Sequence, residues 1–389
     1  MISSLDVGGA EHALESLLSN IDRSRFHNRV VCMIAPGDVG ERISAMGLQV
    51  DSLHMRRGRP TPSAVWRLAR LVQRERPDLV QSWLYHADLL ALLASVLARH
   101  RRLIWNVRSS DMDMRRYRRL SGLTVAACAR FSSFPAAVVV NSQAGRAYHE
   151  AIGYRPRRWV LIPNGVDVEL FCPDPEARAH VQKELGLGAD TLLIGLVARF
   201  DPMKDHTTFL AAARLTTKAE ARVHFLLAGQ GVTPDNPALA AELTDAFASR
   251  VHLLGQRDDI PRLMAALDVL ACSSSFGEGF PNAVAEAMAC GVPCVVTDVG
   301  DAATIVGETG IVVPRQDPEA LAAGLRTLVA MDAGERRRLG SLARARIERE
   351  FCAERMARAY EELYSSLAGS GPVTGAGGGQ LTSDAYPLR

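Results

Sequence analysis

Segments with strand character and segments with helix character alternate along almost the whole chain, and this alternation constrains the fold more than any other feature. Such a pattern predicts parallel sheets covered by helices on both faces. We expect strands at residues 29–34, 78–82, 103–107, 137–141 and 159–162 in the first half, and at 192–198, 222–228, 251–254, 269–273, 292–297 and 310–313 in the second. The predicted fold class is therefore α/β, with two doubly wound, Rossmann-like domains facing a central cleft.

The 389 residues exceed what one hydrophobic core usually supports, so two domains are expected. The alternation breaks at residues 163–167, where an Asn-Gly turn marks a hinge. We therefore expect a first domain at 1–165 and a second at 166–350. A helix at 351–367 is expected to pack back on the first domain, and the glycine-rich residues 368–389 are expected to form a disordered tail.

Composition excludes several classes of protein. The seven cysteines form no Cys-x-x-Cys pair, which argues against a zinc or redox site, and no metal site is predicted. No Gly-x-Gly-x-x-Gly follows a strand, so a nicotinamide enzyme is disfavoured. The apolar runs at 89–98 and 136–140 are too short to span a bilayer, and the start of the chain lacks a signal segment. A cytoplasmic protein is expected.

Charge is distributed unevenly between the two halves. Residues 1–165 hold 24 arginines against 13 acidic residues, whereas the whole chain has a net charge of only +2. Arginine clusters at 56–59, 99–102, 115–119 and 155–158 can meet anionic lipid headgroups or a phosphate-bearing acceptor. Solvated helix faces are the plainer alternative. Nucleic acid is disfavoured, because no recognition helix or base-stacking motif accompanies the charge.

The segment 276–289 places two carboxylates, Glu278 and Glu286, eight positions apart across a turn from strand to helix. Pro281 suits the first turn of that helix, whose free N–H groups favour an anionic or hydroxyl-rich ligand. Glu286 lies among apolar residues, where a carboxylate is costly unless it has a partner. The pattern predicts a sugar-nucleotide site. The alternatives are a hydrolytic carboxylate pair and two solvated surface charges.

Two further segments point at the same cleft. Arg199 and Lys204 follow the strand at 192–198, and together they outline a clamp for a diphosphate, with solvated loop cations as the alternative. Gly8 and Gly9 precede a helical pattern, in a turn where backbone can approach a phosphate or a sugar closely.

Four more residues follow predicted strands and are weaker candidates. His86 opens a helix after the strand at 78–82, where it can touch a transferred sugar or simply pack. Arg108 and Asp111 follow the strand at 103–107 and are expected to hold acceptor groups. Arg257 follows the strand at 251–254, where it can meet a nucleotide base.

Taken together, these motifs resemble the retaining GT-B glycosyltransferases of family four, the glycosyl transferases group 1, over roughly residues 3–367. The family's Glu-x7-Glu signature falls on Glu278 and Glu286, its phosphate-binding cations on Arg199 and Lys204, and its early glycine loop on residues 8–11. The linker at 163–167 also looks like the family's.

The resemblance implies a role for each matched residue. Glu286 is expected to bind the nucleotide ribose, Arg199 and Lys204 the diphosphate, and His86 to stand beside the donor sugar. Glu278 is expected to bind the donor sugar, together with the turn residues Gly279, Phe280, Pro281 and Asn282.

This chain departs from the family pattern at two places. Only four residues precede Leu5, where the family normally has a full first strand, so the strand is clipped or the true start lies upstream. Gln81 and Trp83 stand where such members carry histidines, which weakens any inference about the acceptor.

The expected activity is transfer of a sugar from a nucleoside-diphosphate sugar to a hydroxyl of a glycan or lipid-linked acceptor, in polysaccharide or glycolipid biosynthesis. The resemblance implies that the departing phosphate accepts the proton of the acceptor, so no side-chain base is required. Arg199 and Lys204 are expected to stabilise the leaving diphosphate without a metal, and no cofactor is expected. A location in the cytoplasm, at the inner face of the membrane, follows from a lipid-linked acceptor. The alternatives are a catalytically silent sugar-nucleotide or lipid-binding scaffold, a transferase acting on a soluble acceptor, and a phosphorylase-type enzyme with a pyridoxal-phosphate lysine.

Overall fold

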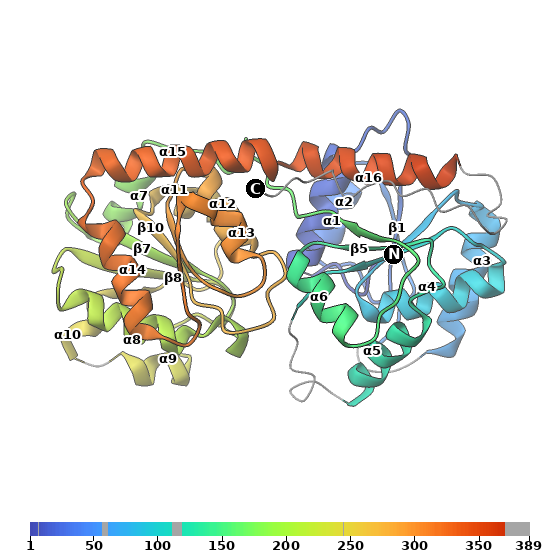
Figure 1. Ribbon diagram of the computed structural model, residues 1–389, viewed down its shortest axis with the longest axis horizontal. Coiled ribbons are helices and arrows are strands. Elements are labelled where there is room, and N and C mark those ends of the chain that lie inside the picture. The colour runs from blue at the N-terminus through green and yellow to red at the C-terminus, as the bar shows by residue number, and fades with distance from the viewer. Residues whose placement is uncertain (7, 57–60, 111–118, 244, 370–389) are drawn as a thin grey trace.

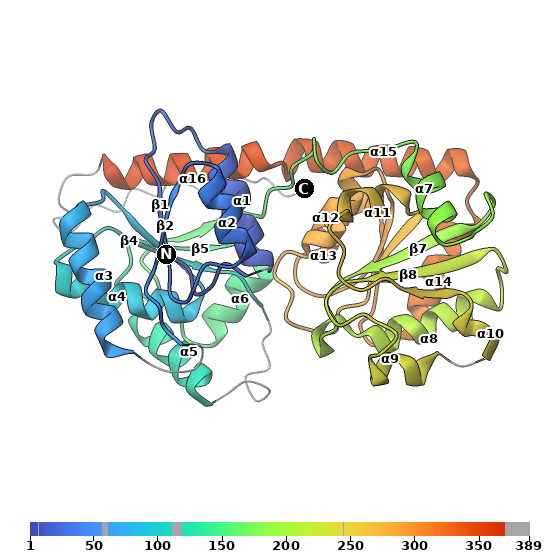
Figure 2. The same cartoon turned by 180° about the vertical axis from the view of Figure 1, so that it is seen from behind.

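The computed structural model describes residues 1–6, 8–56, 61–110, 119–243 and 245–369. Two α/β domains lie side by side, and the last two helices run along one edge of both (Figure 1). Seen from behind, the same two helices still lie along that edge, so they bridge the domains (Figure 2).

The second domain is built on a parallel sheet of six strands, in the order β12-β11-β10-β7-β8-β9. Its strands are β7 (Leu192–Val197), β8 (Val223–Ala228), β9 (Val251–Leu253), β10 (Val269–Cys272), β11 (Cys294–Thr297) and β12 (Ile311–Val313). The chain leaves β7 in one direction for β8 and β9, and returns to its other side for β10. This reversal between β7 and β10 creates the crevice where open parallel sheets bind ligands.

Helices cover both faces of this sheet and bury a core on each. They are α7 (Ala177–Glu184), α8 (His206–Thr217), α9 (Pro237–Glu242), α10 (Asp245–Ala248), α11 (Ile260–Ala266), α12 (Asn282–Ala289), α13 (Ala302–Val306), α14 (Pro318–Ala330) and α15 (Ala333–Glu350), with 3-10 turns η2 (Pro202–Lys204) and η3 (Gly307–Thr309). One core lies under α12, where Val284, Ala287 and Met288 are fully buried, and the other lies under α8 and α14.

The first domain has the same plan around a much shorter central strand. Its strands are β1 (Arg29–Cys32), β2 (Gln49–Ser52), β3 (Val80–Trp83), β4 (Leu103–Val107), β5 (Ala137–Val140) and β6 (Trp159–Leu161). Ile2 makes parallel bridges to both Cys32 and Trp83, so this one residue joins the pair β1-β2 to the sheet β3-β4-β5-β6. The chain order around Ile2 therefore matches the order around β7.

The helices of the first domain also form two layers. They are α1 (Gly9–Asn20), α2 (Asp38–Ala45), α3 (Pro62–Glu75), α4 (Tyr85–Ala98), α5 (Arg119–Phe131) and α6 (Gln143–Ala151). One core contains residues of α1 and α2, and the other contains residues of α3, α4 and α5. In both views α3, α4 and α5 lie on the side of the domain away from the last helix.

The chain crosses between the domains twice, and the two crossings are paired. Val166 bridges Cys352, and a Cβ added to Gly165 would lie 2.6 Å from Cα of Ala353, so only glycine fits there. After the second crossing, α16 (Ala353–Ala368) packs against α1. Met356, Ala357, Tyr360 and Leu363 thereby join the core of the first domain. Of the tail expected at 368–389, only the first two residues are described.

The α/β class and the arrangement of two doubly wound domains are confirmed. Strand β2 was not expected, because its sequence Gln-Val-Asp-Ser is short and none of its residues is fully buried. Pro281 is the residue before α12, so the expectation that it lies within the first helical turn is wrong by one position.

Candidate functional site

The crevice between β7 and β10 collects the predicted cations and carboxylates of the second domain. The loop after β7 folds into η2, in which the Asp201 side chain accepts a hydrogen bond from the Met203 N–H at 2.9 Å. Asp205 then takes a left-handed conformation, with φ of 49°, and caps α8 through Thr208. This turn fixes the backbone of Lys204 at the carboxyl end of the central strand.

Lys204 and Glu278 form an ion pair, although 74 positions separate them in the chain. Ser274 donates a second hydrogen bond to Oε1 of Glu278 at 2.7 Å. Burial is the largest effect on the Lys204 ammonium and lowers its pKa, but the charge of Glu278, the neighbouring Cys272 and the hydrogen bond to Glu278 together outweigh burial, so the pKa is raised. Lys204 is therefore charged at neutral pH, and its charge is balanced within the protein.

Arg199 lies near this pair but is more exposed to solvent. Its guanidinium contacts Asp201 at 3.2 Å, and half of the side chain is accessible. An ammonium or guanidinium at the end of a core strand has several N–H donors, so each can hold an internal carboxylate and still contact a phosphate. Both predicted cations of the clamp thus lie on the loop after β7.

Helix α12 begins at Asn282 without a side chain that caps its first turn. A Cβ on Gly279 of the preceding turn would lie 2.7 Å from Oδ1 of Asn141, and a Cβ on Gly300, between β11 and α13, would lie 2.4 Å from the Glu278 carbonyl oxygen, so the turn is packed closely on both sides. Phe280 is buried and packs edge-on against Phe351. The turn can therefore offer backbone N–H groups to an anion at the start of the helix.

Glu286 lies one helical turn further along α12, and none of the described residues makes a hydrogen bond to its carboxylate. Burial raises its pKa to about 7, against the smaller opposing effects of His12 and Lys204. His12 belongs to α1, so its influence shows that α1 lies across the cleft from α12. A half-buried carboxylate without a partner is suited to accept hydrogen bonds from ligand hydroxyls.

The glycine turn of the first domain faces the start of α12. A Cβ on Gly9 would lie 3.5 Å from Nδ2 of Asn282, and a Cβ on Gly8 would lie 2.4 Å from Oε2 of Glu11. Helix α1 begins at Gly9, and Gly8 provides no side-chain cap. The predicted glycine loop and the predicted turn at 279–282 are therefore brought together.

Several contacts between the domains were not predicted from the sequence. Ser110, after β4, donates a hydrogen bond to the carbonyl oxygen of Glu278. Asn164, at the first crossing, donates to Oδ1 of Asn282 at 2.6 Å. The only signal for Ser110 was its place after a buried strand, the signal already used for Arg108 and Asp111.

Asp301 forms another such contact. Its carboxylate accepts from the N–H groups of Gln143 and Ala144, at 2.8 and 3.0 Å, at the start of α6. Burial raises its pKa, whereas those two bonds act in the opposite direction. An acidic residue at a helix start is electrostatically favourable, so this contact holds the second domain against the first.

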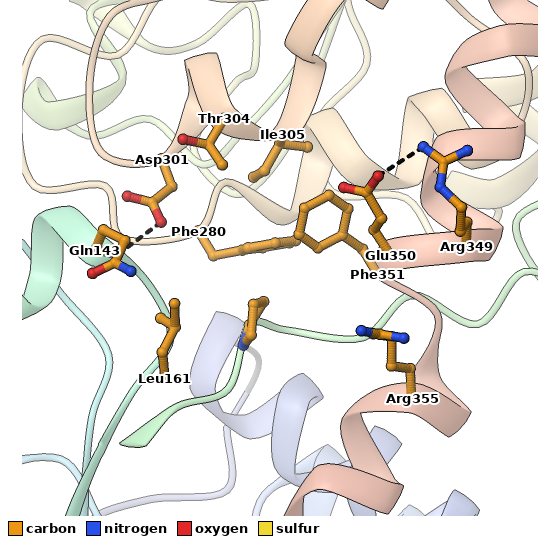
Figure 3. Close-up of a pocket in the computed structure, with 11 residues that line it drawn as sticks. Gln143, Leu161, Phe280, Asp301, Thr304, Ile305, Arg349, Glu350, Phe351 and Arg355 are labelled. Atoms are coloured by element: carbon orange, nitrogen blue, oxygen red, sulfur yellow. Dashed lines mark hydrogen bonds and ion pairs between the residues drawn. The ribbon is translucent and has the colours of Figure 1, made fainter. Parts of the chain in front are cut away.

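A cavity of about 260 Å³ lies between the domains on the hinge side of the turn. Figure 3 shows the ring of Phe280 between Asp301, which binds Gln143, and Phe351 of the second crossing. Of the predicted site residues, only Phe280 lines this cavity. The cavity is therefore separate from the predicted sugar-nucleotide site.

Arg108 is buried beneath the cleft rather than extended into it. Its Nη2 donates to Oδ1 of Asn164 at 2.6 Å, Nη1 lies near Asn106 and Tyr360, and the guanidinium lies 4.7 Å from the ring centre of Trp83. Burial lowers its pKa. Its Nε has no hydrogen-bond partner among the described residues. The contact of Arg108 with an acceptor group stays a prediction, and Asp111 lies outside the described residues.

The remaining two candidates have different surroundings. His86 is the second residue of α4 and is exposed, and no described residue makes a hydrogen bond to it. Arg257 donates to Glu184 at 2.5 Å and to Asp259 at 2.7 Å, and these bonds raise its pKa. The Arg257 guanidinium thus has two internal carboxylates as partners, and its contact with a nucleotide base stays a prediction.

Within the described ranges, no cluster of His, Cys, Asp and Glu side chains could hold a metal ion. None of the helices in those ranges combines the length and the apolar character needed to cross a bilayer.

Two family models match the chain, one in each domain. Residues 7–170 match Glycosyltransferase Family 4, and residues 191–331 match Glycosyl transferases group 1.

Two curated relatives show similarity over part of their length. The chain is 34% identical over 160 residues to a protein named putative glycosyltransferase EpsF of Bacillus subtilis, covering 40% of each chain. It is 32% identical over 146 residues to an Escherichia coli UDP-Gal:alpha-D-GlcNAc-diphosphoundecaprenol alpha-1,3-galactosyltransferase, covering 37% of this chain and 38% of that one. The chain therefore spans well under two thirds of these relatives.

Solved structures agree with the fold over nearly the whole chain. Anabaena HepE in complex with UDP and glucose has a TM-score of 0.80 at 23% identity, covering 94% of this chain and 98% of the other. WaaG, a glycosyltransferase involved in lipopolysaccharide biosynthesis, has a TM-score of 0.69 at 16% identity, covering 95% and 99%. These likenesses establish the two-domain GT-B fold.

Proposed function

We propose that the chain is a glycosyltransferase, because its first domain matches Glycosyltransferase Family 4 and its second matches Glycosyl transferases group 1. It moves a sugar from a nucleoside-diphosphate sugar to a hydroxyl of a glycan or lipid-linked acceptor, with retention of the anomeric configuration. The acceptor belongs to polysaccharide or glycolipid biosynthesis, and the enzyme works in the cytoplasm at the inner face of the membrane.

The observation that carries this proposal is the arrangement at the β7–β10 crevice. Glu278, which pairs with Lys204, lies four residues before the start of α12, and the unpartnered Glu286 lies four residues after that uncapped start. A sugar nucleotide has matching parts: a diphosphate for the cations and helix N–H groups, and ribose hydroxyls for Glu286. Glu278 and the backbone of residues 279–281 take the hydroxyls of the sugar. HepE, with the same fold, binds UDP and glucose in its crystal, which supports a donor of this class.

Charge stabilisation at the leaving group is the main catalytic contribution. As the bond from the anomeric carbon to the diphosphate oxygen breaks, negative charge grows on that oxygen. Lys204, Arg199 and the N–H groups at the start of α12 are held in place to stabilise this charge. The acceptor oxygen bonds to the anomeric carbon on the same face, and its proton passes to the departing phosphate. No side-chain base, metal or cofactor takes part.

The first domain supplies the acceptor side. Its surface is rich in arginine, and Ser110 lies against the Glu278 backbone at the cleft. A lipid-linked acceptor with a phosphate or diphosphate suits this charge, as does contact with an anionic membrane. The E. coli relative is named for an acceptor of that kind, a diphosphoundecaprenol.

A thermal-shift screen of nucleoside-diphosphate sugars tests the donor first. A ligand at one hundred times its dissociation constant adds about 2.7 kcal/mol to stability, so the correct donor raises the melting temperature and identifies base and sugar together. Release of nucleoside diphosphate with a lipid-linked acceptor then tests transfer. Binding without release would identify a silent scaffold, and no shift with any donor at millimolar concentration would contradict the proposal.

The proposed independence from metals has its own test. Treatment with EDTA is expected to leave turnover within about twofold of the untreated enzyme, because fixed protein cations do the work that Mg²⁺ does elsewhere. Loss of turnover that Mg²⁺ or Mn²⁺ restores would contradict this part of the proposal.

A further inference from the structure

The outer side of α3, α4 and α5 carries an exposed apolar surface that the catalytic proposal does not use. An open groove there is lined only by apolar side chains, including Val65, Leu93, Val96, Leu97, Phe131 and Phe134. Trp66 and Leu123, exposed by 61% and 67%, extend the apolar surface on α3 and α5. Contiguous apolar surface of this kind marks an interaction site in proteins that are otherwise stable in water. We call these eight residues the α3–α5 surface.

Helix α4 shows why this surface is not a by-product of core packing. It buries Ala87, Leu90, Ala91 and Ala94 against the sheet, as a covering helix should. Its opposite face carries Leu93, Val96 and Leu97, which are 47%, 60% and 41% exposed. These residues follow the spacing of one helical stripe, where a surface helix ordinarily has polar residues. Both faces of α4 are therefore apolar.

The charges around the α3–α5 surface are almost all positive. Exposed arginines lie on the same three helices: Arg67 and Arg70 on α3, Arg99 at the end of α4, and Arg130 on α5, with its guanidinium 5.8 Å from the ring centre of Phe131. Few described acidic residues lie on the same elements. Asp88 is fully buried, and Glu75 pairs with Arg29 and Arg74.

We propose that the α3–α5 surface inserts its apolar side chains into the interfacial layer of an anionic lipid bilayer, with the flanking arginines on the headgroups. Apolar side chains ringed by cations fit an anionic membrane surface, because the two contributions to binding add together. A second copy of this chain fits less well, since a symmetric contact would bring the arginines of both copies together. This inference deepens the proposed membrane contact and rests on that part of the proposed function.

The position of this surface also suits the cleft. Helix α4 begins at the cleft with Tyr85 and His86, and Val96 lies about 15 Å further along its axis. A bilayer that receives Val96 therefore lies beside the cleft and not across it. A lipid-linked acceptor could reach the start of α12 without leaving the membrane.

Co-sedimentation with phosphatidylcholine vesicles, with and without phosphatidylglycerol, tests the proposal. We expect the wild-type protein to bind the anionic vesicles and to be released in part by high salt. The double variant Leu93→Ser/Val96→Ser should bind at least about tenfold more weakly, because both apolar anchors are lost. Leu342→Ser is the matched control, since Leu342 is 54% exposed on α15 of the other domain. It should bind like the wild type.

A charge variant separates the two contributions. Arg67→Gln/Arg70→Gln should weaken binding to anionic vesicles by about tenfold and leave weak binding to neutral vesicles unchanged. Arg337→Gln/Arg338→Gln, two exposed arginines of α15, should have little effect. Equal loss in both arginine pairs would overturn the proposal, because it would show attraction to the whole protein and not to this surface.

Two other outcomes would also overturn it. One is that the wild-type protein does not co-sediment with anionic vesicles. The other is a dimer in light scattering that Leu93→Ser/Val96→Ser converts to a monomer, which would assign the surface to a second copy. Donor-induced thermal stabilisation is measured on every variant. If it persists while vesicle binding is absent, the membrane inference fails and the transferase proposal does not.

Discussion

Each domain places a half-buried cation beside the cleft, and the protein surrounds the two cations differently. Lys204, in the second domain, has a carboxylate partner in Glu278. Arg108, in the first, has only the neutral oxygens of Asn106, Asn164 and Tyr360 and the face of Trp83. The first arrangement raises the pKa of its cation and the second lowers it.

The difference indicates how charge is divided across the cleft. On the donor side, charges of both signs are already present, so a diphosphate and its sugar find complementary groups that need little rearrangement. On the other side, a cation held only by dipoles leaves uncompensated positive charge under the place where the acceptor enters. Glu286 differs from the paired charges Lys204 and Glu278 of the second domain, because, like Arg108, it has no opposite charge in contact with it.

The largest expected effect comes from removing the balanced cation. Lys204→Ala should lower kcat by about 10²–10³, the usual loss when one fixed donor to a developing charge is removed. Glu278 keeps its hydrogen bond from Ser274, so the fold should persist in circular dichroism. Lys218→Ala is the matched control, because Lys218 is exposed at the end of α8. Near-normal turnover of Lys204→Ala would remove Lys204 from the diphosphate clamp.

A smaller effect is expected from the unbalanced carboxylate of the second domain. Burial raises the pKa of Glu286 from 4.5 to about 7. Between these two values the unfolded chain has lost a proton that the folded protein keeps, so stability falls as pH rises and levels off above about 7.

The fall amounts to about 3 kcal/mol if the full shift is realised. Urea unfolding of the ligand-free protein at pH 5 and pH 8 measures it, with Glu286→Gln as the variant that should lack this part of the pH dependence. The same pH dependence in wild type and variant would mean that Glu286 is not desolvated.

The smallest of the three effects concerns Arg108. Arg108→Lys keeps the charge but loses the planar fork that contacts Asn164 and Tyr360 together, so it should cost about 1–2 kcal/mol of stability. Turnover should fall less than in Lys204→Ala. Arg101→Lys, at an exposed arginine before β4, is the control in the same urea titration. If Arg108→Lys lost as much turnover as Lys204→Ala, the proposed difference between the donor side and the acceptor side of the cleft would be wrong.

Much of the fold could be read from the sequence, because buried parallel strands are apolar runs that turn residues separate. Loops that follow neighbouring strands share one edge of a sheet, which is why the loops after β7 and β10 could be placed together. Strand β2 escaped detection because Gln49 is exposed and its neighbours are only partly buried.

The contacts within the site were less predictable. Lys204 and Glu278 could be assigned to one crevice, but their direct pairing depends on how the two loops bend. Ser110, Asn164 and Asp301 were missed because each contacts the opposite domain, and no local pattern encodes the placement of one domain on the other. The apolar run at 89–98 was noted only as too short to span a bilayer, because sequence alone did not show which of its side chains face outward.

The return of α16 to the first domain has a consequence for how the protein is made. Met356, Ala357, Tyr360 and Leu363 complete a core whose other members precede the whole second domain in the chain and so leave the ribosome before it. The first domain must therefore wait, with part of its apolar interior uncovered, until the second has been synthesised. Domains usually fold in order of synthesis, whereas here the first domain can complete its core only after the second domain has been made.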